Sequence, residues 1–204
     1  DIAQCLVGSE MCIRDRCVAT HIYNMDLPFI YRIHESPKEE KLRDFLSFVS
    51  NLGYQVTGDL KGNKSIAVQK LLKFVHDKKE GPILTSLLLR CMQKAIYSPT
   101  NVGHFGLGSS CYTHFTSPIR RYPDTTVHRL LRTYLFNHDL SSHTIHHYEE
   151  KLIFVADHSS AMERASVDCE REVEDMKMAE YMESHIGEEF EGMISSVMSF
   201  GMFV

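Results

Sequence analysis

Residues 104–132 read HFGLGSSCYTHFTSPIRRYPDTTVHRLLR, and this stretch decides how the whole chain is interpreted. Within it, Arg120 follows Thr116, Ser117 and Pro118 in a turn that is rich in hydroxyl groups. Such a turn can bring a guanidinium and several short donors to one oxyanion, and the fixed fork of arginine suits a phosphate. In a phosphodiester hydrolase, this arginine would stabilise the charge that develops on the scissile group.

Spacing alone allows a second interpretation of the same turn. Arg120 or Arg121 could form an ion pair with Asp124 that braces the turn and has no ligand. The segment also carries four of the 22 Lys and Arg residues, which form a candidate basic patch: Arg120, Arg121, Arg129 and Arg132. The net charge of −5 excludes a protein coated in positive charge, but it leaves room for such a local basic site.

Length and composition limit the number of domains and the classes of protein to which the chain can belong. A chain of 204 residues with 43% hydrophobic content can bury one full core and part of a second domain. No apolar run approaches the roughly 18 residues of a membrane span, and no basic-then-apolar leader begins the chain, so we expect a soluble cytoplasmic protein. The six cysteines form no CxxC pair and the 12 histidines no HExxH motif, which argues against a zinc site or a disulfide framework.

Apolar residues at helical spacing predict a helix-rich chain. The expected helices cover residues 37–53, 65–75, 82–96, 124–136, 145–155 and a longer segment that begins at 159 or 160, with a break expected at Gly187. Two of them are expected to begin with a capping box, Ser36 with Glu39 and Ser160 with Glu163. Between Tyr97 and Asp124, glycines and prolines interrupt any helical period, so irregular or extended chain is expected there, with strand mainly at 97–117 and again after 188.

Three motifs in the central stretch carry a family resemblance. GHFGL (103–107), YTHFTSPIRRYPD (112–124) and VHR (127–129) resemble the signature of the RNB catalytic domain, which ribonuclease II, ribonuclease R and the eukaryotic exosome nuclease share. The flanking chain agrees in order and spacing, with HIYNMDLPFIYRIHESPKEEKLRDFLSFVSNLGY, LLLRCMQKAIYS and SAMERASVDCEREVEDMKMAEYM. The resemblance covers about residues 17–204 and is closest to ribonuclease R-type enzymes.

The resemblance implies an α+β fold, namely the C-terminal, helix-rich part of an RNB domain over residues 17–185. Members of this family thread single-stranded RNA to a buried site and remove nucleoside 5′-monophosphates one at a time from the 3′ end. By match, Arg120 contacts the phosphate near the scissile bond. Thr116, Ser117, Arg121 and Tyr122 would shape the same pocket. His104 and Phe105 belong to the motif too, and either touch RNA or support the turn.

The last residues resemble a different module. IGEEFEGMISSVMSFGMFV (186–204) is similar to the start of an S1 domain, an OB-fold barrel that binds single-stranded RNA. In such barrels the first strands carry aromatic rings on which bases stack, and Phe200 and Phe203 match that motif. Taken without the resemblance, both would be core residues. A barrel cut off at Val204 would fulfil neither role well.

The metal site of the family has no match in this chain. RNB catalysis resembles two-metal hydrolysis, in which carboxylates hold Mg²⁺, and the aspartate cluster of the family lies upstream of residue 1. The acids at 37–44 and 163–175 belong to amphipathic helices, so no metal ligand is assigned. Residues 1–16 depart from the family pattern, and LVGSEMCIRDR (6–16) looks like translated sequencing-adapter DNA, so this segment is interpreted as an assembly artefact.

Three functional hypotheses follow. The chain is a fragment of a 3′-to-5′ exoribonuclease with a monomeric parent, inactive alone because it lacks the metal-binding aspartates. Alternatively, it is a non-catalytic module that binds single-stranded RNA through Arg120, with neither DNA nor membrane as a partner. Or it is a purely structural helical protein, in which case Arg120→Ala would lower thermal stability and RNA would have no effect.

Overall fold

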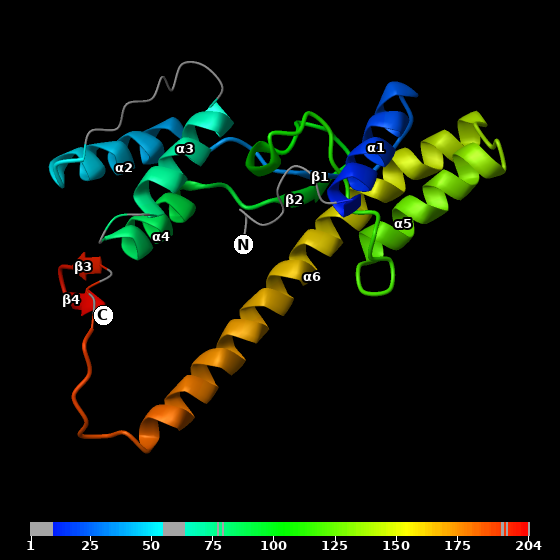
Figure 1. The fold of residues 1–204 in the computed structure, drawn as a ribbon. Coiled ribbons are helices and arrows are strands. Elements are labelled where there is room, and N and C mark those ends of the chain that lie inside the picture. The colour runs from blue at the N-terminus through cyan, green and yellow to red at the C-terminus, as the bar shows by residue number, and fades with distance from the viewer. Residues whose placement is uncertain are drawn as a thin grey trace. The chain divides into compact units, whose positions relative to one another are not determined.

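The structure is a computed structural model that describes residues 10–54, 64–76, 78, 80–192, 194 and 196–203 of the chain. The chain forms two compact units, Asp1–Ala161 and Met162–Val204 (Figure 1). The elements follow one another as α1 (Glu10–Asn24), β1 (Tyr31–Ile33), α2 (Glu39–Asn51), α3 (Lys64–His76), α4 (Gly81–Cys91), β2 (Ile96–Ser98), the 3-10 turn η1 (Phe105–Leu107), α5 (Tyr122–Leu131), the π-helical turn η2 (Arg132–Phe136), α6 (Ser142–Glu183), β3 (Ser196–Met198) and β4 (Gly201–Phe203).

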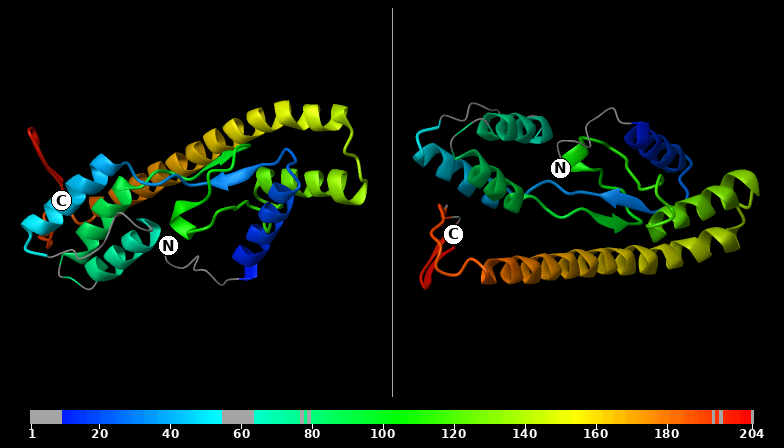
Figure 2. Two further views of the ribbon diagram at one scale, coloured as in Figure 1. Left: turned by 90° about the horizontal axis from the view of Figure 1, so that it is seen from above. Right: turned by 60° about the horizontal axis from the view of Figure 1, so that its bottom comes forward.

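The first core of the larger unit surrounds the antiparallel pair β1–β2, in which Arg32 lies opposite Tyr97. Apolar side chains from α1, both strands, α5, η2 and the start of α6 close around it: Ala19, Ile22, Phe29, Ile30, Tyr31, Ile33, Tyr97, Cys111, Val127, Leu130, Tyr134, Leu152, Val155 and Ala156. In both views of Figure 2, α5 and the first turns of α6 lie side by side, as this shared core requires. The loop that carries the SPIRRY motif (residues 117–122) leads directly into α5. Because α5 packs in this core, the core fixes the position of the C-terminal end of the loop.

A second core holds α2, α3 and α4 together through Leu42, Phe45, Val49, Val68, Leu71, Val75, Leu84 and Leu88. The periodic apolar face predicted for residues 37–53 supplies Leu42, Phe45 and Val49 to it, as expected for an amphipathic helix laid on a core. Gly53 ends this helix with a positive φ of 85°, a conformation that glycine adopts without steric cost.

Neither predicted capping box forms. The N-cap of α2 is Lys38 and makes no side-chain capping bond, because the helix begins at Glu39, three residues after Ser36 and beyond the reach of a box centred there. Ser160 lies inside α6, where its hydroxyl donates to Ala156 O at 2.8 Å. A serine that bonds the carbonyl one turn earlier continues a helix, so the two helices predicted here are one.

The extents of strand were also predicted incorrectly. The predicted helix 82–96 stops at Cys91, because Ile96 pairs with Ile33 in the sheet instead. Residues 99–117 contain isolated bridges at His104 but no strand, and backbone hydrogen bonds to Arg32 and His34 help to hold them. The helix-rich α+β class is as predicted.

The smaller unit contains the rest of α6, a turn that ends at Gly187 and the hairpin β3–β4. The predicted break at Gly187 is confirmed, and its φ of 97° again favours glycine. The hairpin pairs Val197 with Met202, but the structure does not confirm the start of an S1 barrel. Among the described residues, no helix is long and apolar enough to cross a membrane.

Candidate nucleic-acid interface

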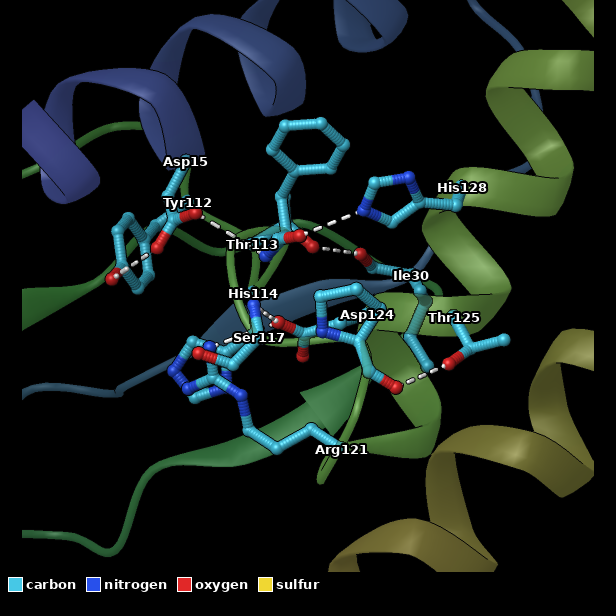
Figure 3. Close-up of polar contacts among 12 residues, drawn as sticks. Asp15, Ile30, Tyr112, Thr113, His114, Ser117, Arg121, Asp124, Thr125 and His128 are labelled. Carbon is cyan, nitrogen blue, oxygen red and sulfur yellow. Dashed lines mark hydrogen bonds and ion pairs between the residues drawn. The ribbon is translucent and has the colours of Figure 1, made fainter.

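The turn between Ser117 and α5 is held by hydrogen bonds at both ends (Figure 3). The Ser117 N–H donates to Asp124 Oδ2 at 2.7 Å, and the Thr125 hydroxyl donates to Pro118 O at 2.8 Å. Asp124 sits in the first turn of α5, where the helix dipole favours a carboxylate. The motif therefore folds back on the helix that it precedes.

Of the two ion pairs that the sequence allowed, Arg120–Asp124 and Arg121–Asp124, the structure contains the second. Asp124 Oδ2 accepts from the Arg121 guanidinium at 2.9 Å, and the two side chains are 0% and 19% exposed, respectively. Arg120, the neighbour, is exposed, and its guanidinium forms no hydrogen bond or ion pair with the residues that the structure describes. Arg121 therefore braces the turn, whereas Arg120 is exposed.

The other predicted residues of the turn differ in how exposed they are. Tyr122 is 51% exposed, and the guanidinium carbon of Arg129 lies 5.8 Å from its ring centroid. Thr116 Oγ1 is buried and has no hydrogen-bond partner within the described part of the chain. The turn therefore carries Thr116, Ser117, Arg120, Arg121 and Tyr122, and their contacts with RNA stay predictions.

A group of side chains that the sequence analysis missed lies beneath the turn. The Tyr97 hydroxyl and His114 Nδ1 are 2.8 Å apart, and the guanidinium carbon of Arg32 lies 4.6 Å from the centroid of the Tyr97 ring. Burial above all, with the nearby charges of Arg121, Arg32 and Arg120, lowers the pKa of His114 to about 2. The ring is therefore neutral at physiological pH and adds no positive charge to that of the three arginines.

Asp15 supports the same segment from α1. Its carboxylate accepts from the Tyr112 hydroxyl at 3.0 Å and from the Phe115 N–H at 3.2 Å. Burial raises the pKa of Asp15, although both hydrogen bonds and the charge of Arg121 oppose that shift. The sequence indicated no role for Asp15, because residues 1–16 depart from the family pattern.

The GHFG motif has a supporting role in the structure. The backbone N–H groups of Phe105 and Gly106 donate to the backbone oxygen and to Nδ1 of His34, at 2.8 and 3.1 Å. A Cβ on Gly106 would lie 2.8 Å from that same Nδ1, so the close approach requires glycine. Burial, with His34 and Arg32, lowers the pKa of His104 to about 3, so this ring is also neutral.

No metal site emerges from the residues that the structure describes, since no three His, Cys, Asp or Glu side chains gather there. The two carboxylates near the turn, Asp15 and Asp124, both accept hydrogen bonds from the protein. Their chemistry in this fold is to brace backbone and side chains.

The two aromatic residues predicted to stack on bases belong to the smaller unit. Phe200 lies in the turn of the β3–β4 hairpin with 79% of its surface exposed. Phe203 is in β4, where its backbone pairs with Ser196.

Comparison with known proteins gives the chain its family. The model of the RNB domain matches residues 1–137. This chain belongs to the RNB family. Ribonuclease R 1 of Lactococcus lactis is 47% identical over 203 residues, which cover 100% of this chain and 25% of that protein.

Solved structures of RNB enzymes agree. Mycoplasma genitalium RNase R in complex with ribose-methylated single-stranded RNA matches with a TM-score of 0.88 at 34% identity, over 95% of this chain and 30% of that one. The same enzyme in complex with double-stranded RNA matches with a TM-score of 0.86 over 95% and 34% of the two chains. This chain thus spans about a quarter to a third of the length of its RNB relatives.

The matched RNB residues begin before Cys17, where the resemblance was recognised, and end at residue 137. Helix α1 likewise runs from Glu10 through Cys17 without a break. The domain boundaries at Cys17 and residue 185 stay predictions.

Proposed function

We propose that this chain is part of a 3′-to-5′ exoribonuclease that hydrolyses single-stranded RNA to nucleoside 5′-monophosphates, and that it supplies the arginine that binds the phosphate at the cleavage point. One observation carries the proposal. Because Arg121 is committed to the buried Asp124, Arg120 is presented outward on a turn whose backbone is fixed. Membership of the RNB family supports the choice of RNA as the ligand.

The geometry suits a phosphodiester. A guanidinium offers two parallel N–H donors to two phosphate oxygens and is always charged, so it can hold the ground state and stabilise added negative charge during hydrolysis. The Thr116 hydroxyl and the exposed Tyr122 ring lie on the same turn and would complete the pocket. A turn held at both ends places these groups without the entropy cost of ordering a loose loop.

Hydrolysis in the parent enzyme would use Mg²⁺, which would activate the attacking water and stabilise negative charge on the phosphate. We propose that the aspartates for this ion come from a segment upstream of this sequence, because Asp15 and Asp124 already accept hydrogen bonds from Tyr112, Phe115, Ser117 and Arg121. The chain alone would then bind RNA with little or no cleavage. A cytoplasmic location and a monomeric parent are further parts of this proposal.

A second candidate function is a non-catalytic single-stranded RNA-binding module. The committed carboxylates and the exposed Arg120 favour it equally well. The two candidates differ in what happens when this sequence is joined to an upstream RNB segment: the first gains magnesium-dependent release of nucleoside monophosphates, and the second does not.

The test is an affinity titration of the purified chain with a fluorescein-labelled oligouridylate, in wild type, Arg120→Ala and Arg90→Ala. Arg90 is an exposed arginine on α4 and serves as the matched control. Arg120→Ala should weaken binding about 10- to 150-fold, as expected for one charge-assisted contact worth about 1.5–3 kcal/mol, and Arg90→Ala should bind as wild type does.

Equal affinity for Arg120→Ala and wild type would refute the phosphate role. Magnesium-dependent release of nucleoside monophosphates by the isolated chain would refute the claim that its metal ligands lie elsewhere.

A further inference from the structure

The tip of the SPIRRY turn carries an apolar side chain. Residues 117–120 form a turn that is closed by a hydrogen bond from the Arg120 N–H to Ser117 O at 3.3 Å, so Pro118 and Ile119 occupy its two central positions. Ile119 is 97% exposed, a larger fraction than for any other large apolar side chain that the structure describes. This side chain therefore has almost no contact with the described part of the chain.

The backbone that carries Ile119 is held in place. Pro118 O accepts from the Thr125 hydroxyl at 2.8 Å, and the Ser117 N–H donates to Asp124 Oδ2 at 2.7 Å. The two residues before Ile119 are thus tied to the first turn of α5, and the proline ring also fixes its own φ. Ile119 cannot withdraw toward the core without breaking these bonds.

An isoleucine is an unusual residue for the centre of a turn. Such positions usually carry Gly, Asn, Asp or Ser, which permit special backbone angles or form local hydrogen bonds, and isoleucine does neither. Its apolar surface stays in water here, which contact with a partner would relieve. Single exposed apolar residues are common, but this one lies on a loop held by a scaffold, where binding residues tend to sit.

The neighbour of Ile119 indicates the kind of partner. Arg120 is exposed, and its Cα lies about 3.8 Å from that of Ile119 because the two residues are consecutive. A positive charge beside an apolar side chain matches a nucleotide, in which a phosphate is joined to a base whose flat face packs on such side chains. The charge of Arg120 therefore favours RNA over a protein segment as the group that covers Ile119.

We propose that Ile119 packs against the base of the nucleotide whose phosphate Arg120 binds. This inference rests on the proposed function, since it takes Arg120 as the phosphate contact. Every base has a flat face, so this contact holds the strand without preference for one base. One turn then fixes both the phosphate and the base of a single nucleotide, which positions that nucleotide for cleavage.

Two ligands separate contact with the base from contact with the phosphate. One is the fluorescein-labelled oligouridylate, and the other is a labelled strand of the same length whose riboses carry no bases. Ile119→Ser should weaken binding of the oligouridylate by about 4-fold for each methyl or methylene group that the base covers. It should leave the affinity for the abasic strand unchanged, whereas Arg120→Ala should weaken binding of both strands.

Two variants serve as controls. Ile119→Val keeps an apolar side chain at the tip, so its affinity for the oligouridylate should be closer to wild type than that of Ile119→Ser. Ile186→Ser makes the same change in the turn after α6, where the side chain is 84% exposed, and should bind both strands as wild type does. Because Ile119 is so exposed, Ile119→Ser should melt at the wild-type temperature.

The outcomes separate the inference from its foundation. Unchanged affinity of Ile119→Ser for the oligouridylate, with weaker binding by Arg120→Ala, would overturn the role of Ile119 alone and leave a protein segment as its cover. Equal weakening for both strands by Ile119→Ser would also overturn it, since the side chain would then act through the phosphate contact. Wild-type affinity of Arg120→Ala, or no binding by the wild-type chain, would overturn the proposed function and this inference together.

A second measurement needs no substitution. In the wild-type chain saturated with the oligouridylate, NMR should give cross peaks between the methyl protons of Ile119 and the protons of a uracil base, because the two groups lie in contact. No such cross peaks at saturation would overturn the inference.

Discussion

The turn at residues 116–125 and the hairpin at residues 196–203 were both predicted from the sequence to bind RNA, yet they differ in how the structure holds them. The turn is tied to buried groups: Asp124 is 0% exposed and accepts from Ser117 and Arg121. The hairpin consists of two three-residue strands, and its described side chains are exposed, with Phe200 at 79% and Val197 at 72%.

This difference in burial indicates when a sequence motif by itself determines the positions of its side chains. An isolated two-stranded hairpin is marginally stable in water, so its side chains are placed by whatever packs on it. The SPIRRY turn needs no such addition, because a buried carboxylate and the first turn of α5 already define it. We therefore expect substitutions in the turn to have large effects and substitutions in the hairpin to have small ones.

The largest effect should come from Asp124→Ala. This change leaves the half-buried Arg121 guanidinium and the Ser117 N–H without their acceptor, and breaking a buried pair in this way costs about 3–5 kcal/mol of unfolding free energy. Urea unfolding measures it. The control is Glu180→Ala, which removes an ion pair with Lys177 whose partners are both 64% exposed and should cost no more than about 0.5 kcal/mol.

Similar losses for the two alanine variants would remove the distinction between the braced turn and the exposed surface of the smaller unit. They would also mean that Arg120 is not presented by the Arg121–Asp124 pair.

An intermediate effect is expected at Asp15, and it depends on pH. Burial raises the pKa of this carboxyl above its usual value of 3.8, so folding favours the protonated form. The stability that Asp15 contributes is then fully present below pH 3.8 and is lost as the pH rises through the higher folded-state pKa. Asp15→Asn, which cannot ionise, should gain stability relative to wild type as the pH rises from 3 to 7.

Urea unfolding of both proteins across that pH range gives the difference directly. A constant difference between Asp15→Asn and wild type would show that the carboxyl is not buried as described. Tyr112→Phe removes only the hydroxyl that donates to Asp15, and should cost about 1 kcal/mol at any pH below 7.

The smallest effect is predicted for Phe200→Ala. Because its side chain is 79% exposed, the substitution should change the unfolding free energy by no more than about 0.5 kcal/mol. If the hairpin stacks on bases only within a complete barrel, RNA affinity should fall by much less than the roughly 1–3 kcal/mol of a full base–aromatic stack. A full loss of that size in the oligouridylate titration would show that the hairpin is a working site by itself.

Local sequence patterns predicted most helices and the turn. They did not predict that α6 is continuous, nor the contacts between residues far apart in the sequence. The apolar period located α2 and α5 because burial of one helix face follows from spacing alone. It split α6 in two because a serine followed by a glutamate resembles a capping box, whereas Ser160 is buried against the Tyr97 N–H and Ala156 O.

The contacts among Arg32, Tyr97 and His114 could not be predicted, since the strand pairing of β1 with β2 brings Arg32 to Tyr97. Spacing did identify both possible partners of Asp124. It could not choose between them, because the choice depends on which guanidinium points toward the first turn of α5.

The origin of residues 1–16 stays a prediction with a direct test. Sequencing the genomic locus across the codons for Arg16 and Cys17 should reveal a reading frame that continues upstream into an aspartate-rich RNB segment. A locus that encodes residues 1–16 as written would make Asp15 a natural part of the fold.

The central claim is that Arg121 braces the turn and Arg120 binds RNA. Thermal melting of wild type and Arg120→Ala, each with and without the oligouridylate, tests it most directly. RNA that binds the folded state raises Tm by mass action, so the account predicts equal Tm values without RNA and a rise on adding RNA that is much larger for wild type. A lower Tm for Arg120→Ala without RNA, and no effect of RNA on either protein, would contradict it.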